Sequence, residues 1–143
     1  MKIDMKVLDL LLKNAKKAFN EGEIPVSAVI LDSNGNVISS SYNNRQNSCN
    51  VLGHAEVLAI LKAEKKLKDW RLDGYSMFVS LEPCDMCSMV IKESRLDKVY
   101  YFLSKKSDKS DINIDVNKLI IDDYPEYTEK FRVLLTSFFD NKR

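Results

Sequence analysis

The sequence predicts an α/β sandwich in one domain, on three observations. Helical and strand-like patterns alternate along the chain, in the order αββαβαβ followed by a last helix. The 4 glycines each fall between two such patterns, where a chain reverses its direction. The 143 residues, 45% of them hydrophobic, suffice for one core, since single cores typically use about 100–150 residues. We therefore expect residues 1–143 to form a single domain.

The first half of the chain predicts a helix, a hairpin and a second helix. From about Asp4 to Asn20, apolar residues recur at spacings of three and four with lysines on the other face, which is typical of an amphipathic helix. Pro25 precedes the β-rich run VSAVILD, which a segment containing Asn34-Gly35 joins to VISSSYN. That pair tolerates the positive φ angles of a type I′ turn, so we expect a hairpin. After an irregular loop from Asn43 to Gly53, helical spacing returns from His54 to about Leu67.

The second half predicts two further strands and two further helices. The apolar run from Ser76 to Leu81 predicts a buried strand that leads directly into a helix over about Cys84 to Glu93, with a proline at the helix start. A strand from Lys98 to Leu103 and a polar loop from Ser104 to Asp115 follow. The chain then ends in a helix whose apolar residues are Tyr127, Phe131, Leu134, Leu135 and Phe138.

Composition excludes several classes of protein. The 22 lysines and arginines nearly balance the 21 acidic residues, so any contact with nucleic acid must depend on a local basic patch. The amino terminus lacks an apolar signal core, and no stretch approaches the roughly 18 apolar residues of a membrane span. We therefore expect a cytoplasmic protein with no membrane partner. An odd count of 3 cysteines favours metal or redox chemistry over a disulfide framework.

Three residues form a candidate metal centre: His54, the only histidine, and the pair Cys84 and Cys87. Two thiolates one helical turn apart can share one soft cation, and zinc takes sulfur and imidazole ligands. Three protein ligands leave a fourth position for water, whose pKa on zinc falls to about 7. Both ligand groups lie at expected helix starts, where free amides and the helix dipole stabilise thiolates.

Glu56 is the candidate catalytic residue. It follows His54 by two residues, about 200° around an ideal helix, so spacing alone does not bring both side chains to one point. Within reach of a metal-bound water, its carboxylate would take a proton and return it to a leaving amine. Cys49 offers an alternative, because a fourth protein ligand would close the site into a structural zinc centre without catalysis.

The strings HAE (54–56) and PCDMC (83–87) resemble the HxE and PCxxC signature of the zinc-dependent nucleoside and base deaminases. Within that superfamily the chain resembles the bacterial tRNA adenosine deaminases, which convert the wobble adenosine of an anticodon to inosine. The strings that carry this resemblance are EGEIPVSAVI (21–30), Asn43-Asn44-Arg45, KDWRLDGYSMFVSLEPCDMC (68–87) and SRLDKVYY (94–101). The resemblance covers about residues 7 to 102, with a weaker similarity in the last helix.

The resemblance implies a fold and a set of roles. The fold is a three-layer α/β/α sandwich of the cytidine deaminase type, with a central mixed sheet and helices on both faces. One zinc ion per subunit would be bound by His54, Cys84 and Cys87, and Glu56 would move the proton. Asn43 would orient the base, because its amide offers a donor and an acceptor, and Ala55 would leave room for the flipped ring. The implied substrate is a tRNA anticodon stem-loop, and the implied assembly is a homodimer.

Some segments depart from the family pattern. Family members commonly have PTAHAE where this chain has VLGHAE, so Gly53 is expected to loosen the approach to His54. The basic stretch after the strand ending at Leu103 keeps Lys105, Lys106 and Lys109 but little else. Single-stranded RNA is bound by aromatic side chains and by cations at its phosphates, and the candidates for such contacts are Phe138, Phe139, Lys142 and Arg143. A deaminase of a free nucleobase or nucleoside, such as cytosine or guanine, remains the alternative.

Overall fold

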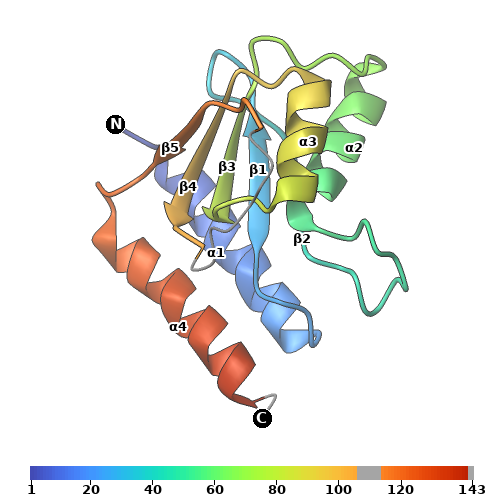
Figure 1. Cartoon of the computed structure of the whole chain (residues 1–143). Helices are drawn as coiled ribbons and strands as arrows, with labels where there is room; N and C mark the ends of the chain where they lie inside the picture. The colour runs from blue at the N-terminus through green and yellow to red at the C-terminus, as the bar shows by residue number, and fades with distance from the viewer. Residues whose placement is uncertain (106–113, 142–143) are drawn as a thin grey trace.

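The computed structural model describes residues 1–105 and 114–141, and Figure 1 shows their path. The elements in chain order are α1 (Met5–Asn20), β1 (Ser27–Leu31), β2 (Val37–Tyr42), α2 (Ala55–Leu67), β3 (Ser76–Leu81), α3 (Asp85–Ser94), β4 (Lys98–Leu103), β5 (Lys118–Ile120) and α4 (Pro125–Asn141). The strands form one five-stranded sheet in the order β2-β1-β3-β4-β5. The sheet is mixed, because β1 is antiparallel to both of its neighbours whereas β3, β4 and β5 run parallel.

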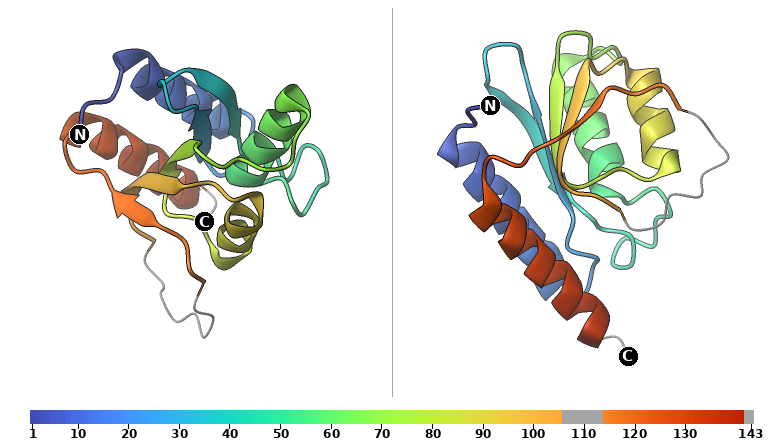
Figure 2. Two further views of the ribbon diagram at one scale, coloured as in Figure 1. Left: turned by 90° about the horizontal axis from the view of Figure 1, so that it is seen from above. Right: turned by 60° about the vertical axis from the view of Figure 1, so that its left-hand side comes forward.

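Helices cover both faces of this sheet, so the predicted three-layer α/β/α sandwich is confirmed. Figure 2 shows α1 and α4 on one face, and α2 and α3 on the other. Successive strand residues point to opposite faces, which divides the core into two hydrophobic clusters. Val29 and Phe78 pack against α1 and α4, whereas their neighbours Ala28 and Met77 pack against α2 and α3. Among the described helices, none has the length and apolar character needed to cross a membrane.

The predicted hairpin is confirmed, but its turn is not type I′. Leu31 pairs with Val37, which leaves a five-residue loop over 32–36. Of the pair Asn34-Gly35, only Gly35 has a positive φ, at 85°. The carboxylate of Asp32 accepts hydrogen bonds from the N–H groups of Asn34 and Asn36, both at 2.9 Å. This aspartate therefore organises the loop, which the dipeptide pattern alone does not reveal.

The sequence did not predict β5. Its three residues, Lys118–Ile120, are too few to display a period of two, and they pair with β4 only. Lys118 is the register partner of Val99 in β4, and its Nζ atom lies 3.5 Å from the carbonyl oxygen of Pro83, in the turn between β3 and α3. The carboxyl end of β3 and the first turns of α2 and α3 meet at one edge of the molecule, where the candidate site lies (Figure 1).

Candidate active site

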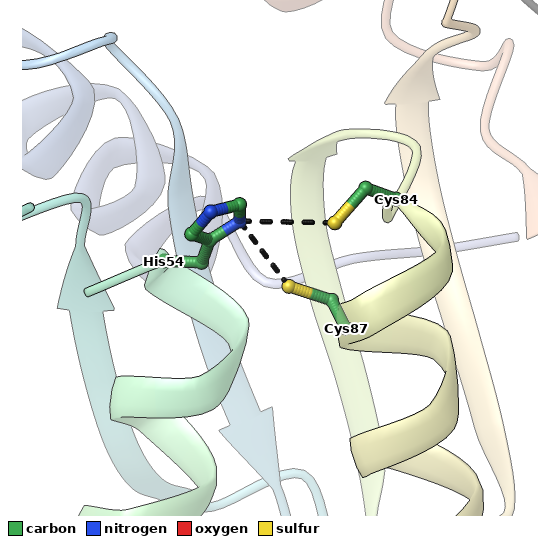
Figure 3. Close-up of side chains that lie close together, drawn as sticks. All are labelled: His54, Cys84 and Cys87. Carbon is green, nitrogen blue, oxygen red and sulfur yellow. Dashed lines mark hydrogen bonds between the residues drawn. The ribbon is translucent and has the colours of Figure 1, made fainter. Parts of the chain in front are cut away.

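The structure brings His54, Cys84 and Cys87 together (Figure 3). The His54 Nδ1 atom lies 3.8 Å from the Cys84 Sγ atom and 3.4 Å from the Cys87 Sγ atom. Among the described residues these three form the only group of potential metal ligands, with all ligand atoms within 4.8 Å of one another. Zinc bonds of about 2.0–2.3 Å in a tetrahedron separate ligand atoms by roughly 3.5 Å. The donor set and its spacing therefore fit zinc.

Two helix N-termini position these side chains. His54 is the N-cap of α2 and Cys84 is the N-cap of α3, and both have extended backbone angles. Neither side chain makes a capping hydrogen bond, so both are available to a ligand. Cys87 lies in the first turn of α3 and is fully buried. The prediction that two helix starts converge is thus confirmed by their geometry.

The surroundings of Cys84 favour its thiolate. A hydrogen bond from the Cys87 thiol lowers the pKa of Cys84 to about 5 against the opposing effect of burial. The backbone N–H groups of Cys87 and Met86 and the charge of His54 lower the pKa further. The pKa of Cys87 is raised because its thiol donates to Cys84 and is buried. One cysteine is therefore ionised at neutral pH, the state in which it binds metal.

Glu56 lies beside these residues, inside the protein. Its side chain is nearly inaccessible, and its residue is only 4% exposed. Burial raises the pKa of Glu56 to about 7, its own backbone N–H opposes the rise, and the charge of Cys84 adds to it. A carboxyl group that titrates near neutral pH can both accept and donate a proton. The first turn of α2 thus places the Glu56 carboxyl near the candidate ligands. The spacing of about 200° from His54 did not by itself predict this proximity.

A cavity of about 490 Å³ opens next to His54. Such a volume lies within the usual range for small-ligand sites, about 300–1,000 Å³. Its lining includes three side chains singled out from the sequence, Asn43, Phe138 and Phe139, together with His54. The two phenyl rings meet edge to face at a centroid distance of 5.3 Å, and Phe139 is 51% exposed whereas Phe138 is buried. Lys142 and Arg143, like Lys106 and Lys109, lie outside the described residues.

Asn43 links the cavity wall to the start of α2. Its Oδ1 atom accepts a hydrogen bond of 2.7 Å from the Ala55 N–H, and its backbone N–H donates to the Val26 carbonyl at 3.0 Å. The first bond fixes the side-chain amide of Asn43 next to His54, and the second fixes its backbone. Ala55 is fully buried and packs in the hydrophobic cluster beneath α2.

The buried carboxylate of Glu23 is a feature that the sequence interpretation missed. Only 1% of Glu23 is exposed, and its oxygens accept hydrogen bonds from the N–H groups of Arg45, Gln46 and Asn47 at 2.8–3.1 Å. The Asn47 side chain adds another at 2.7 Å. Burial raises the pKa of Glu23, but these hydrogen bonds outweigh it and lower the pKa below its ordinary value. Glu23 therefore anchors the loop that forms one wall of the cavity.

Gly53 tightens the approach to His54, contrary to the expectation that it loosens it. The Asn44 N–H donates to the Gly53 carbonyl at 2.8 Å, which closes the loop over residues 44–53. A Cβ atom on Gly53 would lie 2.5 Å from the Asn44 carbonyl oxygen and 2.9 Å from the Arg45 Cα atom. Glycine is therefore required because two backbone segments touch at this position.

Cys49 lies apart from the metal ligands. It is exposed, and its Sγ atom contacts the Gln46 carbonyl at 3.8 Å. It is not in the ligand group around His54. The structure therefore gives no support to a site closed by a fourth protein ligand from Cys49.

Comparisons with known proteins agree with this site. Residues 1–103 match the family model for the cytidine and deoxycytidylate deaminase zinc-binding region. The chain is 30% identical over 143 residues to the tRNA-specific adenosine deaminase of Buchnera aphidicola subsp. Schizaphis graminum, covering 95% of this chain and 93% of that protein. With other relatives of that name it is 42–45% identical over 90–91 residues, and it spans only 55–63% of their length.

Two solved structures extend the comparison. One, from a study of A-to-I editing by tRNA:A34 deaminases, has a TM-score of 0.72 and 28% identity and covers 80% of this chain and 95% of that chain. The other, guanine deaminase from Bacillus subtilis, has a TM-score of 0.65 and 34% identity and covers 72% of this chain and 66% of that chain. The matched family region contains His54, Glu56, Cys84 and Cys87. The chain therefore belongs to the zinc-binding cytidine and deoxycytidylate deaminase family, and within it is similar to the tRNA-specific adenosine deaminases.

Proposed function

We propose that this protein is a zinc-dependent hydrolytic deaminase that converts the wobble adenosine of a tRNA anticodon to inosine. The observation that carries the proposal is the buried carboxyl of Glu56 beside His54, Cys84 and Cys87, next to a cavity that His54 and Asn43 line. The similarity to tRNA-specific adenosine deaminases supports the choice of substrate. The overall reaction adds water at C6 of adenine and releases ammonia.

The three ligands would hold one zinc ion per subunit. When bound, zinc supplies a Lewis-acidic centre that lowers the pKa of a coordinated water molecule to about 7. Glu56 takes a proton from the attacking water and later donates one to the leaving amine. Its burial keeps bulk water from exchanging that proton, and a pKa of about 7 suits both transfers.

The cavity wall would bind the target base and its neighbours. Asn43 would offer the N–H donors of its side-chain amide to the purine edge, since its Oδ1 atom already accepts from the Ala55 N–H. Ala55 is small and buried behind this wall, so it would leave room for the ring without contacting it. Phe139 presents an exposed ring on which a flanking base can stack. Phe138 packs edge to face against that ring and would hold it in place. Lys142 and Arg143 would bind phosphates of the stem-loop.

We infer that the whole chain acts as one deaminase domain within a cytoplasmic homodimer. The outer faces of α2 and α3 support this assembly, since Leu61 and Met89 are about half exposed there. Since α2 and α3 pack against each other, a partner subunit on this layer would cover both side chains. Sedimentation of the zinc-loaded protein tests the inference, and a monomer at micromolar concentration would contradict it.

The experiment that tests the substrate uses purified, zinc-loaded protein and a tRNA with adenosine at the wobble position. Inosine is read as guanosine on reverse transcription, so sequencing reports conversion at that one base. We expect conversion at the wobble adenosine of this tRNA, and none at the other adenosines of the same transcript. Zinc-loaded protein that leaves the adenosine transcript unchanged would count against the proposal.

A deaminase of free bases is the second candidate, favoured by the 34% identity to guanine deaminase and by the net charge of +1. The two functions differ in the source of the ammonia released. Incubation with guanine, cytosine or adenosine, followed by an ammonia assay, separates them. Release from a small substrate but not from tRNA would replace the first proposal with the second.

A further inference from the structure

Two lysine ammonium groups converge on the backbone carbonyl that immediately precedes Cys84. The Nζ atom of Lys105 lies 3.2 Å from the Pro83 oxygen, and the Nζ atom of Lys118 lies 3.5 Å from the same atom. Lys105 follows β4 and Lys118 begins β5, so the two side chains reach the turn from separate strands. Their side chains are only 24% and 20% exposed. Lysines usually extend the ammonium away from the protein, whereas these two hold it against the turn between β3 and α3.

Acidic side chains on the same turn balance the two positive charges. Lys118 lies 4.0 Å from the carboxylate of Glu82, and Lys105 lies 3.8 Å from that of Asp85. The backbone N–H of Lys105 also donates to Glu82 at 3.4 Å. The two lysine–carboxylate contacts are ion pairs too long for hydrogen bonds, whereas the contacts of both lysines with the Pro83 oxygen are charge-assisted hydrogen bonds. The network therefore ties residues 82–85 to the ends of β4 and β5.

We propose that Lys105 and Lys118 are positioning residues for the metal ligand Cys84. The carbonyl of Cys84 accepts a hydrogen bond from the Ser88 N–H of α3 at 2.9 Å, but Cys84 has an extended backbone and the peptide before it lies outside the helix. The peptide that joins Pro83 to Cys84 is held instead through its carbonyl oxygen. Rotation of that peptide would swing the Cys84 thiolate away from His54, whose Nδ1 atom lies 3.8 Å away. Groups that orient metal ligands in this way commonly change metal affinity about 10–100-fold when removed.

The inference rests on the metal-binding part of the proposed function and is independent of the substrate. Its test compares Lys105→Met, Lys118→Met and the double variant with Lys62→Met. The control is matched, because the Lys62 ammonium also donates to a backbone carbonyl, that of Ser40, at 3.2 Å. Lys62 itself lies about two helical turns along α2 from His54. Zinc affinity is measured by competition with a chromophoric chelator. Cobalt(II) replaces zinc in a second measurement, because its thiolate absorption bands report ligand geometry.

We expect the double variant to lose about 10–100-fold in zinc affinity, with altered cobalt bands, while Lys62→Met matches the wild type. This loss exceeds the product of the two single losses, since either lysine can hold the carbonyl alone. In the Lys105→Met background, Lys118→Arg keeps the charge and should retain most of the zinc affinity that Lys118→Met loses. A double variant with wild-type zinc affinity and cobalt spectrum would overturn the proposal, whatever its thermal stability. Normal zinc binding without inosine formation in the wild type would instead refute the substrate.

Discussion

Substitution of Gly53 by alanine should destabilise the protein and weaken substrate binding together. The new Cβ atom would lie 2.5 Å from the Asn44 carbonyl oxygen, 0.9 Å closer than the 3.4 Å of an ordinary contact. Both partners are backbone, so relief requires the loop to open at the Asn44–Gly53 hydrogen bond of 2.8 Å. Overpacking costs about 1–3 kcal/mol and the lost bond about 0.5–1.5 kcal/mol. Alanine also lowers the conformational entropy of the unfolded chain, which raises the free energy of unfolding by about 0.4–1 kcal/mol. The net loss of stability is then about 2 kcal/mol.

Urea denaturation of the metal-free protein measures this loss, and steady-state kinetics on the tRNA substrate measures its consequence. The loop carries Asn43 and Arg45 along the cavity, so a shift near 1 Å should lower kcat/KM by about 10²-fold. Gly35→Ala is the matched control. Its φ of 85° predicts a loss of about 1–2 kcal/mol, but the hairpin tip is remote from the cavity, so kinetics should not change. A Gly53→Ala protein with wild-type stability and kcat/KM would refute the reasoning.

Three further predictions follow from single side chains. Glu23→Gln should lower stability at pH 7 by about 1–3 kcal/mol, because the amide leaves N–H groups of the loop unpaired. Because folding lowers the pKa of Glu23, its carboxylate contributes its full stabilisation above the unfolded pKa near 4.5 and loses it as pH falls through the folded pKa. Between pH 7 and 3, the urea midpoint should therefore vary less with pH in the variant than in the wild type. Cys49→Ser should retain full zinc content by elemental analysis, and loss of the metal would revive the structural-zinc alternative. Phe139→Ala should weaken tRNA binding by about 1–3 kcal/mol in a filter assay without lowering the melting temperature, whereas unchanged affinity would remove this ring from the RNA surface.

The repeating elements were accessible from sequence because periodicity encodes which face is buried. The Asp4–Asn20 pattern and the run from Ser76 to Leu81 correspond to α1 and β3 within one residue at each end. The sequence also predicted helix starts at His54 and Cys84, and both residues are N-caps in the structure. It did not predict the short β5, because the pairing of this strand with β4 is set by tertiary contacts rather than by a local pattern.

The metal ligands were predictable for a different reason than the loop that surrounds the cavity. Sulfur and imidazole ligands are rare and chemically specific, so one histidine and a CxxC pair are informative on their own. Glu23 hydrogen-bonds residues 22 to 24 positions away, and Gly53 is constrained by backbone that it meets only after folding. Nothing in the local sequence distinguishes such a glutamate from a solvated one. The same holds for Lys118, whose carbonyl partner lies 35 residues earlier.

The central claim is that Glu56 moves the proton at a zinc centre held by three other residues. Zinc content and inosine formation, measured on one preparation each of wild-type and Glu56→Gln protein, test it most directly. We expect both proteins to bind one zinc per chain, and the variant to lose at least about 10²-fold in turnover, since glutamine fills the same space without accepting the proton. A Glu56→Gln protein that retains wild-type turnover, or one that no longer binds zinc, would contradict this assignment.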